Sequence, residues 1–505
     1  MRMTRTSTFA IALAAARAAA QSPMTYGAGR APGLEWFGDA KFGLFMHWGP
    51  VTQWGAEISF PLVCPAFPCT VQGPGKAPVT IENATALAAH RAAYAALAST
   101  FSPDAFDPPA LARAAREAGF RYMVYTTIHC DGFANWPSNV TAYNSVAGAP
   151  LLRRDVFGEL AAAFRAEGLR VGAYVCPSLW NSDLYWQPDA LTALGSACTP
   201  NYDPGASATD AARWDEYLST TLHALIGELA ARYAPDLFWL DCSNAPPRTD
   251  TRVEALVGAI RAANPEALVM TRGGVFSDYV ELDDQQEAQA AAILGAEQMD
   301  AGTRFEVCGV LQSTTQWAFD PTSGQKPAAE VVRNLATIVA KGGNYLLNVA
   351  PDASGVWPDS ARAVLSDLAA WFAAGGGEAL HYTIPVYPFS DGGGAVLFTA
   401  RSARDAAAAG ARALYAILPT PNATTAGGDA ELTLVPLRPA VLDAPPVRVE
   451  LLQSTDFPAG EVTAWSLRDE GLAINYTIPQ LPANLTPGHQ PPNALALVFR
   501  IQFPL

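Results

Sequence analysis

Residues 121–178 hold the stretch that decides the fold: RYMVYTTIHC (121–130), then DVFGELAAAFRAEG (155–168), then LRVGAYVCPS (169–178). The first and third runs are apolar along most of their length, which is typical of strands that are buried on both faces of a parallel sheet. The middle run carries Leu, Ala and Phe at helical spacing. We therefore predict a strand, a helix and a second, parallel strand.

The same alternation extends from about residue 34 to residue 385. The other apolar runs are KFGLFMHWG, DLFWLDCSN, ALVMTRGG, FEVCGVLQ and GGNYLLNVAP, and the other helical stretches are PPALARAAREAG, WDEYLSTTLHALIGELAARYAP, TRVEALVGAIRAANPE and AEVVRNLATIVAKGG. Seven strand units over about 350 residues favour a (β/α)8-type barrel over an open doubly wound sheet. No GxGxxG follows a strand, so a dinucleotide fold gains no support. We assign residues 22–385 to this α/β barrel.

The last part of the chain, residues 386–505, has a different pattern. Pro and Gly become more frequent, helical periodicity is lost, and short β-rich runs such as RALYAILP, AINYTI and ALALVFRIQF follow one another. That composition predicts a C-terminal antiparallel β-sandwich.

Length and charge limit the classes of function. A chain of 505 residues with 50% apolar residues can bury a large core, and two domains are a fair expectation. The net charge of -15 would repel nucleic acid and anionic membranes. We therefore expect a neutral or cationic substrate and no nucleic-acid partner.

Residues 1–21 predict a secretory signal peptide. Arg2 and Arg5 precede the small and apolar run FAIALAAARAAA, and cleavage would fall between Ala18 and Gln21. A structural helix is the alternative. No later stretch is long and apolar enough for a membrane span. We expect a secreted or lumenal protein, with the lysosome or vacuole among its possible destinations.

Two further features agree with a secretory route. Cys64 and Cys69 bracket PAFP and could close a small disulfide loop, while the seven cysteines leave at least one unpaired. No CxxC pair or His-rich cluster suggests a metal site. Glycosylation sequons occur at Asn83, Asn139, Asn422, Asn475 and Asn484.

Polar residues follow several of the predicted strands directly. His47 ends KFGLFMHWG, His129 and Asp131 follow RYMVYTTI, Asp241 follows LFWL, and Arg272 follows ALVMT. Reactive groups of a barrel lie at these carboxyl ends of the strands. A carboxylate after Phe-Trp-Leu is costly to bury alone, so Asp241 is either hydrogen-bonded structurally or held for reaction.

Cleavage of a glycosidic bond needs a second carboxyl group. Glu306 in FEVC is one candidate, with a structural ion pair as its alternative role. The segment DYVELDDQQE supplies the others, although such an acidic run often faces solvent; its acids are Glu281, Asp283, Asp284 and Glu287. Aromatic faces suit the apolar side of a sugar, and those flanking these positions are Trp48, Trp54, Trp136, Trp180 and Trp239, for which core packing is the alternative.

Five motifs in order resemble the α-L-fucosidases of glycoside hydrolase family 29, over roughly residues 34–385. The segments that carry the resemblance are WFGDAKFGLFMHWGPV, IHCDGFANWPS, FWLDC, FEVC with the downstream Trp317, and KGGNYLLNVAPDASG. They are similar to that family's KFGxFxHWG, HHDGF, [LF]WxDG, WExC and KNGxLLLNxxPxxDG. The resemblance also implies a β-sandwich after the barrel.

The resemblance implies roles for individual residues. Asp241 would be the nucleophile of a retaining exo-α-L-fucosidase that needs no cofactor. Asp284 would be the acid/base, because its loop is long enough to reach over Asp241; Asp283 and Glu306 are the alternatives. The residues expected to bind the fucosylated substrate are His47, Glu57, His129, Trp239 and Arg272.

Two departures from the family pattern bear on substrate preference. Cys130 stands where the second of two adjacent His is common, and Ile58-Ser59 stands where Trp-Tyr is common after the Glu. Cys lacks the hydrogen bonds of an imidazole, and Ile58 lacks an indole N–H. A related sugar such as an α-L-galactoside, or a glycan-binding protein without catalysis, are the alternative functions. The oligomeric state stays open, a homo-oligomer included.

Overall fold

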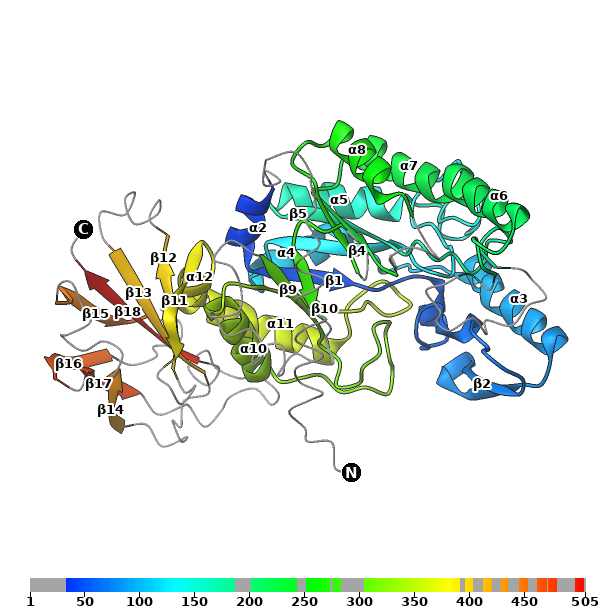
Figure 1. The fold of residues 1–505 in the computed structure, drawn as a ribbon. Coiled ribbons are helices and arrows are strands. Elements are labelled where there is room, and N and C mark those ends of the chain that lie inside the picture. Colours follow the sequence, from blue (N-terminus) through cyan, green and yellow to red (C-terminus); the bar gives the residue numbers. More distant parts are fainter. Residues whose placement is uncertain are drawn as a thin grey trace, which may run out of the picture.

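A computed structural model describes two regions, a barrel and a β domain (Figure 1). The described residues are 33–186, 200, 202–242, 251–272, 276–282, 304–390, 396–402, 412–419, 428–434, 445–452, 461–469, 471–478 and 496–503. The proposed signal peptide lies outside them. No helix within these ranges is long and apolar enough to cross a membrane.

Eight parallel strands form one nearly closed sheet, in the order β7-β6-β5-β4-β1-β10-β9-β8. The strands are β1 (Phe42–Met46), β4 (Tyr122–Ile128), β5 (Arg170–Val175), β6 (Leu237–Leu240), β7 (Leu268–Thr271), β8 (Val280–Leu282), β9 (Phe305–Val310) and β10 (Asn344–Asn348). Seven of them match the predicted apolar runs, and the barrel prediction is confirmed. The eighth, β8, lies in the acidic segment, where three half-buried residues gave no apolar signal.

The barrel opens between its edge strands β7 and β8, and the segment that joins them covers part of the gap. The Asp278 carboxylate accepts a hydrogen bond from Val269 N (2.7 Å), and Asp278 N donates to the Val269 carbonyl (2.9 Å). Val280 N, at the start of β8, donates to the Arg304 carbonyl (2.9 Å). The two bonds of Asp278 satisfy edge groups of Val269 in β7.

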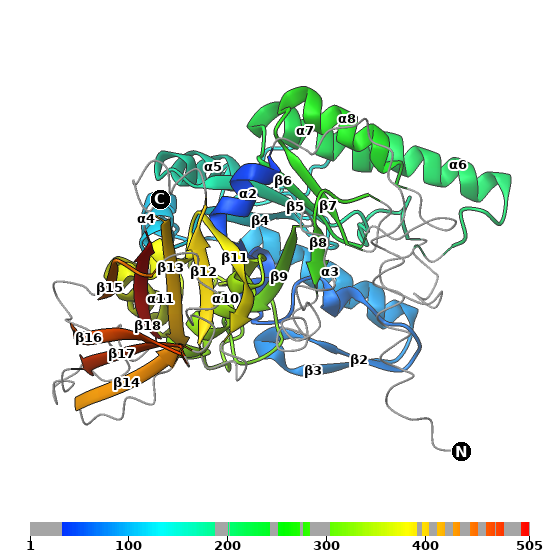
Figure 2. The same ribbon diagram turned by 60° about the vertical axis from the view of Figure 1, so that its left-hand side comes forward.

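Helices surround the strands, and α7 and α8 lie side by side outside the sheet (Figures 1 and 2). Asp107 and Asp155 cap α4 and α5 by accepting from Ala110 N and Gly158 N. The helices are α2 (Leu34–Ala40), α3 (Ala84–Thr100), α4 (Pro108–Glu117), α5 (Val156–Ala166), α6 (Ala208–Tyr217), α7 (His223–Tyr233), α8 (Val253–Ala263), α10 (Ala328–Ala340), α11 (Asp359–Trp371) and α12 (Gly377–Leu380). The long helix predicted at WDEYLSTTLHALIGELAARYAP begins earlier, and a π-helical turn, Leu218–Leu222, divides it into α6 and α7.

Two antiparallel sheets form the C-terminal β-sandwich, as predicted, in the orders β11-β12-β13-β18-β15 and β14-β17-β16. Their strands are β11 (Thr383–Ser390), β12 (Leu397–Arg401), β13 (Arg412–Pro419), β14 (Gly428–Leu434), β15 (Arg448–Leu451), β16 (Glu461–Arg468), β17 (Gly471–Ile478) and β18 (Ala496–Phe503). Figure 2 shows the larger sheet next to α10 and α11. A separate hairpin of β2 (Cys69–Gln72) and β3 (Pro78–Ile81) precedes α3.

The larger sheet packs on both faces, because side chains alternate along its strands. In β13, Leu414 and Ala416 belong to the core between the two sheets, whereas Tyr415 and Ile417 belong to the core that continues into the barrel. The boundary expected at residues 385 and 386 falls inside β11.

Trp371 at the end of α11 ties the barrel to this sheet. Its side chain is 1% exposed, and its Nε1 donates to the Ala496 carbonyl of β18 (3.1 Å). We expect Trp371→Ala to lower the free energy of unfolding by about 3–5 kcal/mol, because it empties a large buried volume. Urea denaturation measures the change. Trp465→Ala is the control, since that side chain is 36% exposed and should cost well under half as much; equal losses would contradict this packing.

Candidate functional site

A cavity of about 660 Å³ lies at the carboxyl ends of the barrel strands. His47 follows β1, His129 follows β4, Asp241 follows β6 and Arg272 follows β7, so all four side chains meet on one side of the barrel. The predicted substrate-binding residues and the predicted nucleophile all line the cavity: His47, Glu57, His129, Trp239, Asp241 and Arg272. The strand-end pattern had pointed to four of these residues, while Glu57 and Trp239 came from the family resemblance; their roles stay predictions.

Asp241 is held by donors on both carboxylate oxygens. Oδ1 accepts from Cys242 N (2.8 Å), and Oδ2 accepts from the Tyr174 hydroxyl (2.8 Å). Arg272 Nη1 lies 3.7 Å from Oδ1, and its guanidinium stands over the Trp239 ring at 5.5 Å. The two donors fix the direction of the carboxylate, and the guanidinium places a positive charge beside it.

Tyr174 is a site residue that the sequence analysis missed. It comes from β5 and lines the cavity. Its ring stacks on the His129 ring and on the Trp239 ring, with centroid distances of 5.3 Å and 5.5 Å. Burial, followed by the Asp241 charge, raises its pKa well above the usual value, so the hydroxyl keeps its proton and remains a donor. The available signal was a lone Tyr near the carboxyl end of the small-residue run LRVGAYV.

His47 is neutral and its protonated nitrogen can be assigned. Burial lowers its pKa to about 3. The Asn348 amide donates through Nδ2 to the Trp317 carbonyl (2.7 Å), so its Oδ1 faces His47 and accepts from His47 Nδ1 (2.9 Å) and His47 N (3.2 Å). The proton therefore sits on Nδ1, and Nε2 carries the lone pair.

His129 contacts a residue from a distant loop. Its Nδ1 lies 2.7 Å from the Ser59 hydroxyl, which also accepts from Asp131 N (2.8 Å). Tyr94 donates to the Asp131 carboxylate (2.7 Å) and accepts from Ser59 N (3.0 Å). Asp131 thus supports this network and does not line the cavity. Burial lowers the His129 pKa to about 3, so this ring is neutral as well.

Glu57 binds the loop that forms the opposite wall of the cavity. Its carboxylate accepts from Ile58 N (2.8 Å), Trp317 N (2.5 Å) and Ala318 N (3.1 Å). Burial raises its pKa to about 7, and the three backbone donors oppose that shift. Glu57 therefore holds Trp317 against the cavity in addition to lining it.

Glu306, the alternative acid/base, lies beneath the cavity rather than on its surface. It is 0% exposed and absent from the lining. Its carboxylate accepts from the Tyr122 hydroxyl (2.5 Å), Trp239 Nε1 (3.2 Å) and the Tyr279 hydroxyl (3.2 Å). Burial raises its pKa to about 7. Because no described opening connects it to the cavity, these contacts argue for a structural role in orienting Trp239.

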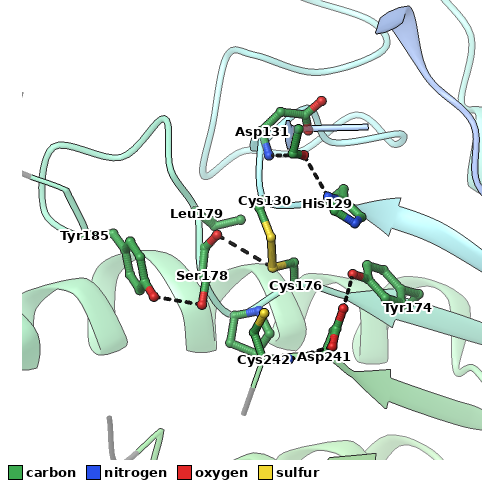
Figure 3. The surroundings of a disulfide bond; sticks show 12 residues. His129, Cys130, Asp131, Tyr174, Cys176, Ser178, Leu179, Tyr185, Asp241 and Cys242 are labelled. Atoms are coloured by element: carbon green, nitrogen blue, oxygen red, sulfur yellow. Dashed lines mark hydrogen bonds between the residues drawn. A yellow bond between two sulfur atoms is a disulfide. The ribbon is translucent and has the colours of Figure 1, made fainter. Parts of the chain in front are cut away.

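A disulfide joins Cys130 after β4 to Cys176 after β5, next to Asp241 and His129 (Figure 3). Cys130, which stands where the family commonly has a second His, thus forms a covalent link between neighbouring strand ends. The sequence analysis had considered only the hydrogen bonds that a Cys lacks at this position. Both cysteines come directly after predicted strands, and this placement was the available signal. Cys242 lies near them and is also disulfide-bonded, so this sulfur cluster does not offer thiolates to a metal.

A second disulfide, Cys64–Cys69, closes the loop at the start of the β2–β3 hairpin, at the positions expected. Thr70, Val71 and Gln72 of this hairpin line the outer part of the cavity. Cys308 is a buried thiol.

Some predicted residues have no described position. Asp283 and Asp284 lie outside the described residues, as do the sequons at Asn422 and Asn484. Asn83 and Asn139 are exposed, and Asn475 is half-buried in β17.

Comparison with known proteins gives one consistent result. The model of the α-L-fucosidase family matches residues 10–377. Tissue α-L-fucosidase of Mus musculus is 28% identical over 364 residues, covering 69% of this chain and 72% of the mouse protein. The Homo sapiens tissue enzyme is 26% identical over 364 residues, covering 69% of each chain.

Solved structures share the fold. A family 29 α-L-fucosidase of Bacteroides thetaiotaomicron, solved as a trapped covalent intermediate, aligns with a TM-score of 0.64 at 20% identity, over 95% of this chain and 97% of that one. α-L-Fucosidase isoenzyme 1 of Paenibacillus thiaminolyticus aligns with a TM-score of 0.64 at 22% identity, over 94% of this chain and 99% of that one.

Proposed function

This chain belongs to the α-L-fucosidase family of glycoside hydrolases, and we propose that it is a retaining exo-α-L-fucosidase with Asp241 as its nucleophile. The observation that carries the proposal is the Asp241 carboxylate itself, which faces the cavity while Tyr174 and Cys242 N fix its two oxygens. In this mechanism Asp241 attacks the anomeric carbon as an acid protonates the leaving oxygen, and water then hydrolyses the glycosyl-enzyme.

Asp241 performs two tasks in this reaction, and its neighbours assist each. As a nucleophile it must be anionic and aimed, which the Tyr174 hydroxyl and Arg272 favour. As a leaving group in the second step it regains its charge, and the same donors stabilise that charge. A trapped covalent intermediate in the structural relative from Bacteroides thetaiotaomicron supports this two-step course.

Aromatic residues of the cavity support fucose as the sugar. The Phe45 ring packs beside the rings of Trp239 and Trp317, with centroid distances of 5.5 Å and 5.7 Å, and all three residues line the cavity. An apolar wall of this kind suits the methyl group of a 6-deoxy sugar, whereas the extra hydroxyl of an α-L-galactoside would lose hydration there without a described partner. His47, Glu57, His129 and Arg272 supply the polar contacts.

Asp284 is our proposed acid/base, with Asp283 as its alternative. Glu281 Oε2 lies 3.3 Å from Arg272 Nε, so an ion pair ties β8 to a residue that lines the cavity. Asp283 and Asp284 follow Glu281 within three positions in the sequence, and we keep both as candidates for this reason. Glu306, which is fully buried, is the less favoured candidate.

We also propose that the protein passes through the secretory pathway, to a lumenal or secreted location. The disulfides Cys64–Cys69 and Cys130–Cys176 are typical of an oxidising compartment. Exposed sequons at Asn83 and Asn139 are compatible with N-glycosylation there.

Removal of the nucleophile should abolish hydrolysis of an aryl α-L-fucoside. We expect Asp241→Ala to lower turnover by several orders of magnitude, with azide restoring part of it by filling the vacated space. The matched control is Asp359→Ala, whose side chain is 91% exposed and does not line the cavity, and which should keep normal turnover. Near-normal turnover of Asp241→Ala would contradict the assignment of Asp241 as the nucleophile. A wild-type protein that binds fucosides without cleaving them would support the alternative of a glycan-binding protein.

Loss of the acid/base residue should lower the rate by an amount that depends on the leaving group of the substrate. We expect Asp284→Ala to slow substrates with poor leaving groups far more than activated aryl fucosides, because departure of an activated phenolate needs little protonation. The alkaline limb of its pH profile should also disappear. If Glu306→Ala shows this pattern and Asp284→Ala does not, the two roles must be exchanged.

A further inference from the structure

We propose that Ser59 is a positioning residue that fixes His129 as the Nε2–H tautomer, so that His129 presents a hydrogen-bond donor to the sugar. His47 presents an acceptor beside it. The inference rests on the proposed function for the identity of the ligand, but the tautomer itself can be measured without substrate.

Among the described residues, the Ser59 hydroxyl has one hydrogen-bond acceptor. Ser59 is 0% exposed, so no solvent reaches it. Its oxygen accepts from Asp131 N (2.8 Å), and its other contact within the described part of the chain is His129 Nδ1 (2.7 Å). If Nδ1 carried a proton, two donors would point at this oxygen and the buried O–H would lack an acceptor. Ser59 therefore donates to Nδ1.

Tyr94 cannot provide that acceptor. Its hydroxyl proton goes to the Asp131 carboxylate (2.7 Å), and its oxygen accepts from the backbone N–H of Ser59 (3.0 Å). The second Asp131 oxygen accepts from Phe133 N (3.2 Å). These bonds hold the backbone of Ser59 in place while its side chain faces His129.

A neutral imidazole whose Nδ1 accepts must carry its proton on Nε2. Burial lowers the His129 pKa to about 3, so the ring is neutral in the range where a glycosidase works. Nε2 has no hydrogen-bond partner among the described residues, and His129 lines the cavity. Stacking on Tyr174, with 8° between the rings, fixes the plane in which this N–H points.

His47 has the opposite tautomer, because Asn348 Oδ1 accepts from its Nδ1 (2.9 Å). The two rings lie 6.0 Å apart between centroids. The cavity thus offers one acceptor and one donor at a spacing that two hydroxyls of one pyranose can bridge: one hydroxyl donates to His47 Nε2, and another accepts from His129 Nε2–H. A sugar whose hydroxyls lie at other positions would leave one or both of these nitrogens without a partner.

The backbone of Ser59 supports a functional role. Its φ is 66°, and Phe60 N donates to the Ile58 carbonyl (2.8 Å) across it, which makes a tight turn centred on Ser59. This conformation disfavours any residue with a Cβ and would be easier for Gly. A Ser kept in it is consistent with a need for the hydroxyl.

The tautomers can be read by NMR of protein labelled with ¹⁵N-histidine, which contains six histidines. We expect His129 to show a protonated Nε2 and an unprotonated Nδ1, and His47 to show the reverse, with no change between pH 5 and pH 8. His129→Gln and His47→Gln identify the two signals. A protonated Nδ1 on His129 would overturn the proposal, whether or not the protein cleaves fucosides.

Kinetics test what the tautomer does. Ser59→Ala and Ser59→Gly both remove the hydroxyl, and only the Gly variant relieves the turn, so we expect both to lower kcat/KM for an aryl α-L-fucoside by about 10-fold, the order expected for one hydrogen bond. The Nδ1 resonance of His129 should move in both variants, because it loses its donor, while that of His381, which binds the Ala40 carbonyl, should not.

A set of monodeoxy fucosides separates this role from a general structural one. The loss caused by Ser59→Ala should nearly vanish for the deoxy substrate that lacks the hydroxyl bound by His129, and it should persist for the others. An equal loss for every substrate, or recovery of activity in Ser59→Gly alone, would show that the turn matters and the hydroxyl does not. Failure of wild-type protein to hydrolyse any fucoside would instead remove the proposed function and leave the NMR result to decide the tautomer.

Discussion

Burial on both faces of the barrel strands governs where polar groups can lie in this protein. Seven of the eight strands are buried along all or nearly all of their length, so an unpaired charge within them would be costly. The strand ends are the places where side chains meet both backbone donors and an open cavity. His47, His129, Asp241 and Arg272 occupy four such ends, and the site follows from that arrangement.

Each ionisable group near the cavity has a different partner, and the partner determines its chemistry. Asp241 has a hydroxyl and a backbone N–H on its oxygens and a guanidinium nearby, which together fix its orientation. Glu306 accepts from three side-chain donors, is fully buried and is not among the described residues that line the cavity, which suits a support for Trp239. The two histidines are kept neutral by burial and oriented by Asn348 and Ser59. The cavity therefore holds one oriented carboxylate beside a guanidinium and two neutral, oriented histidines.

The sequence predicted the parts of the fold that have strong periodicity. Seven apolar runs located seven strands. The sequence analysis did not predict β8, because its residues Val280–Leu282 are half-buried beside an acidic segment. The strand-end rule needs only local sequence, and it pointed to His47, His129, Asp241 and Arg272, which line the same cavity. The sequence analysis missed the roles of Tyr174 and Ser59 because these roles depend on contacts with residues that lie 67 and 70 positions away in sequence. The link between Cys130 and Cys176 likewise depends on the neighbouring positions of β4 and β5.

Covalent labelling of the nucleophile tests the central claim most directly. 2-Fluoro-fucosyl fluoride has a good leaving group, while its electron-withdrawing fluorine slows hydrolysis of the glycosyl-enzyme, so the intermediate accumulates. Proteolysis and tandem mass spectrometry then identify the modified residue. The account requires one fluorofucosyl group per chain, on Asp241, with loss of activity that recovers as the label is hydrolysed. A label on another carboxylate, or an active protein that hydrolyses fucosides yet never carries a label, would contradict it.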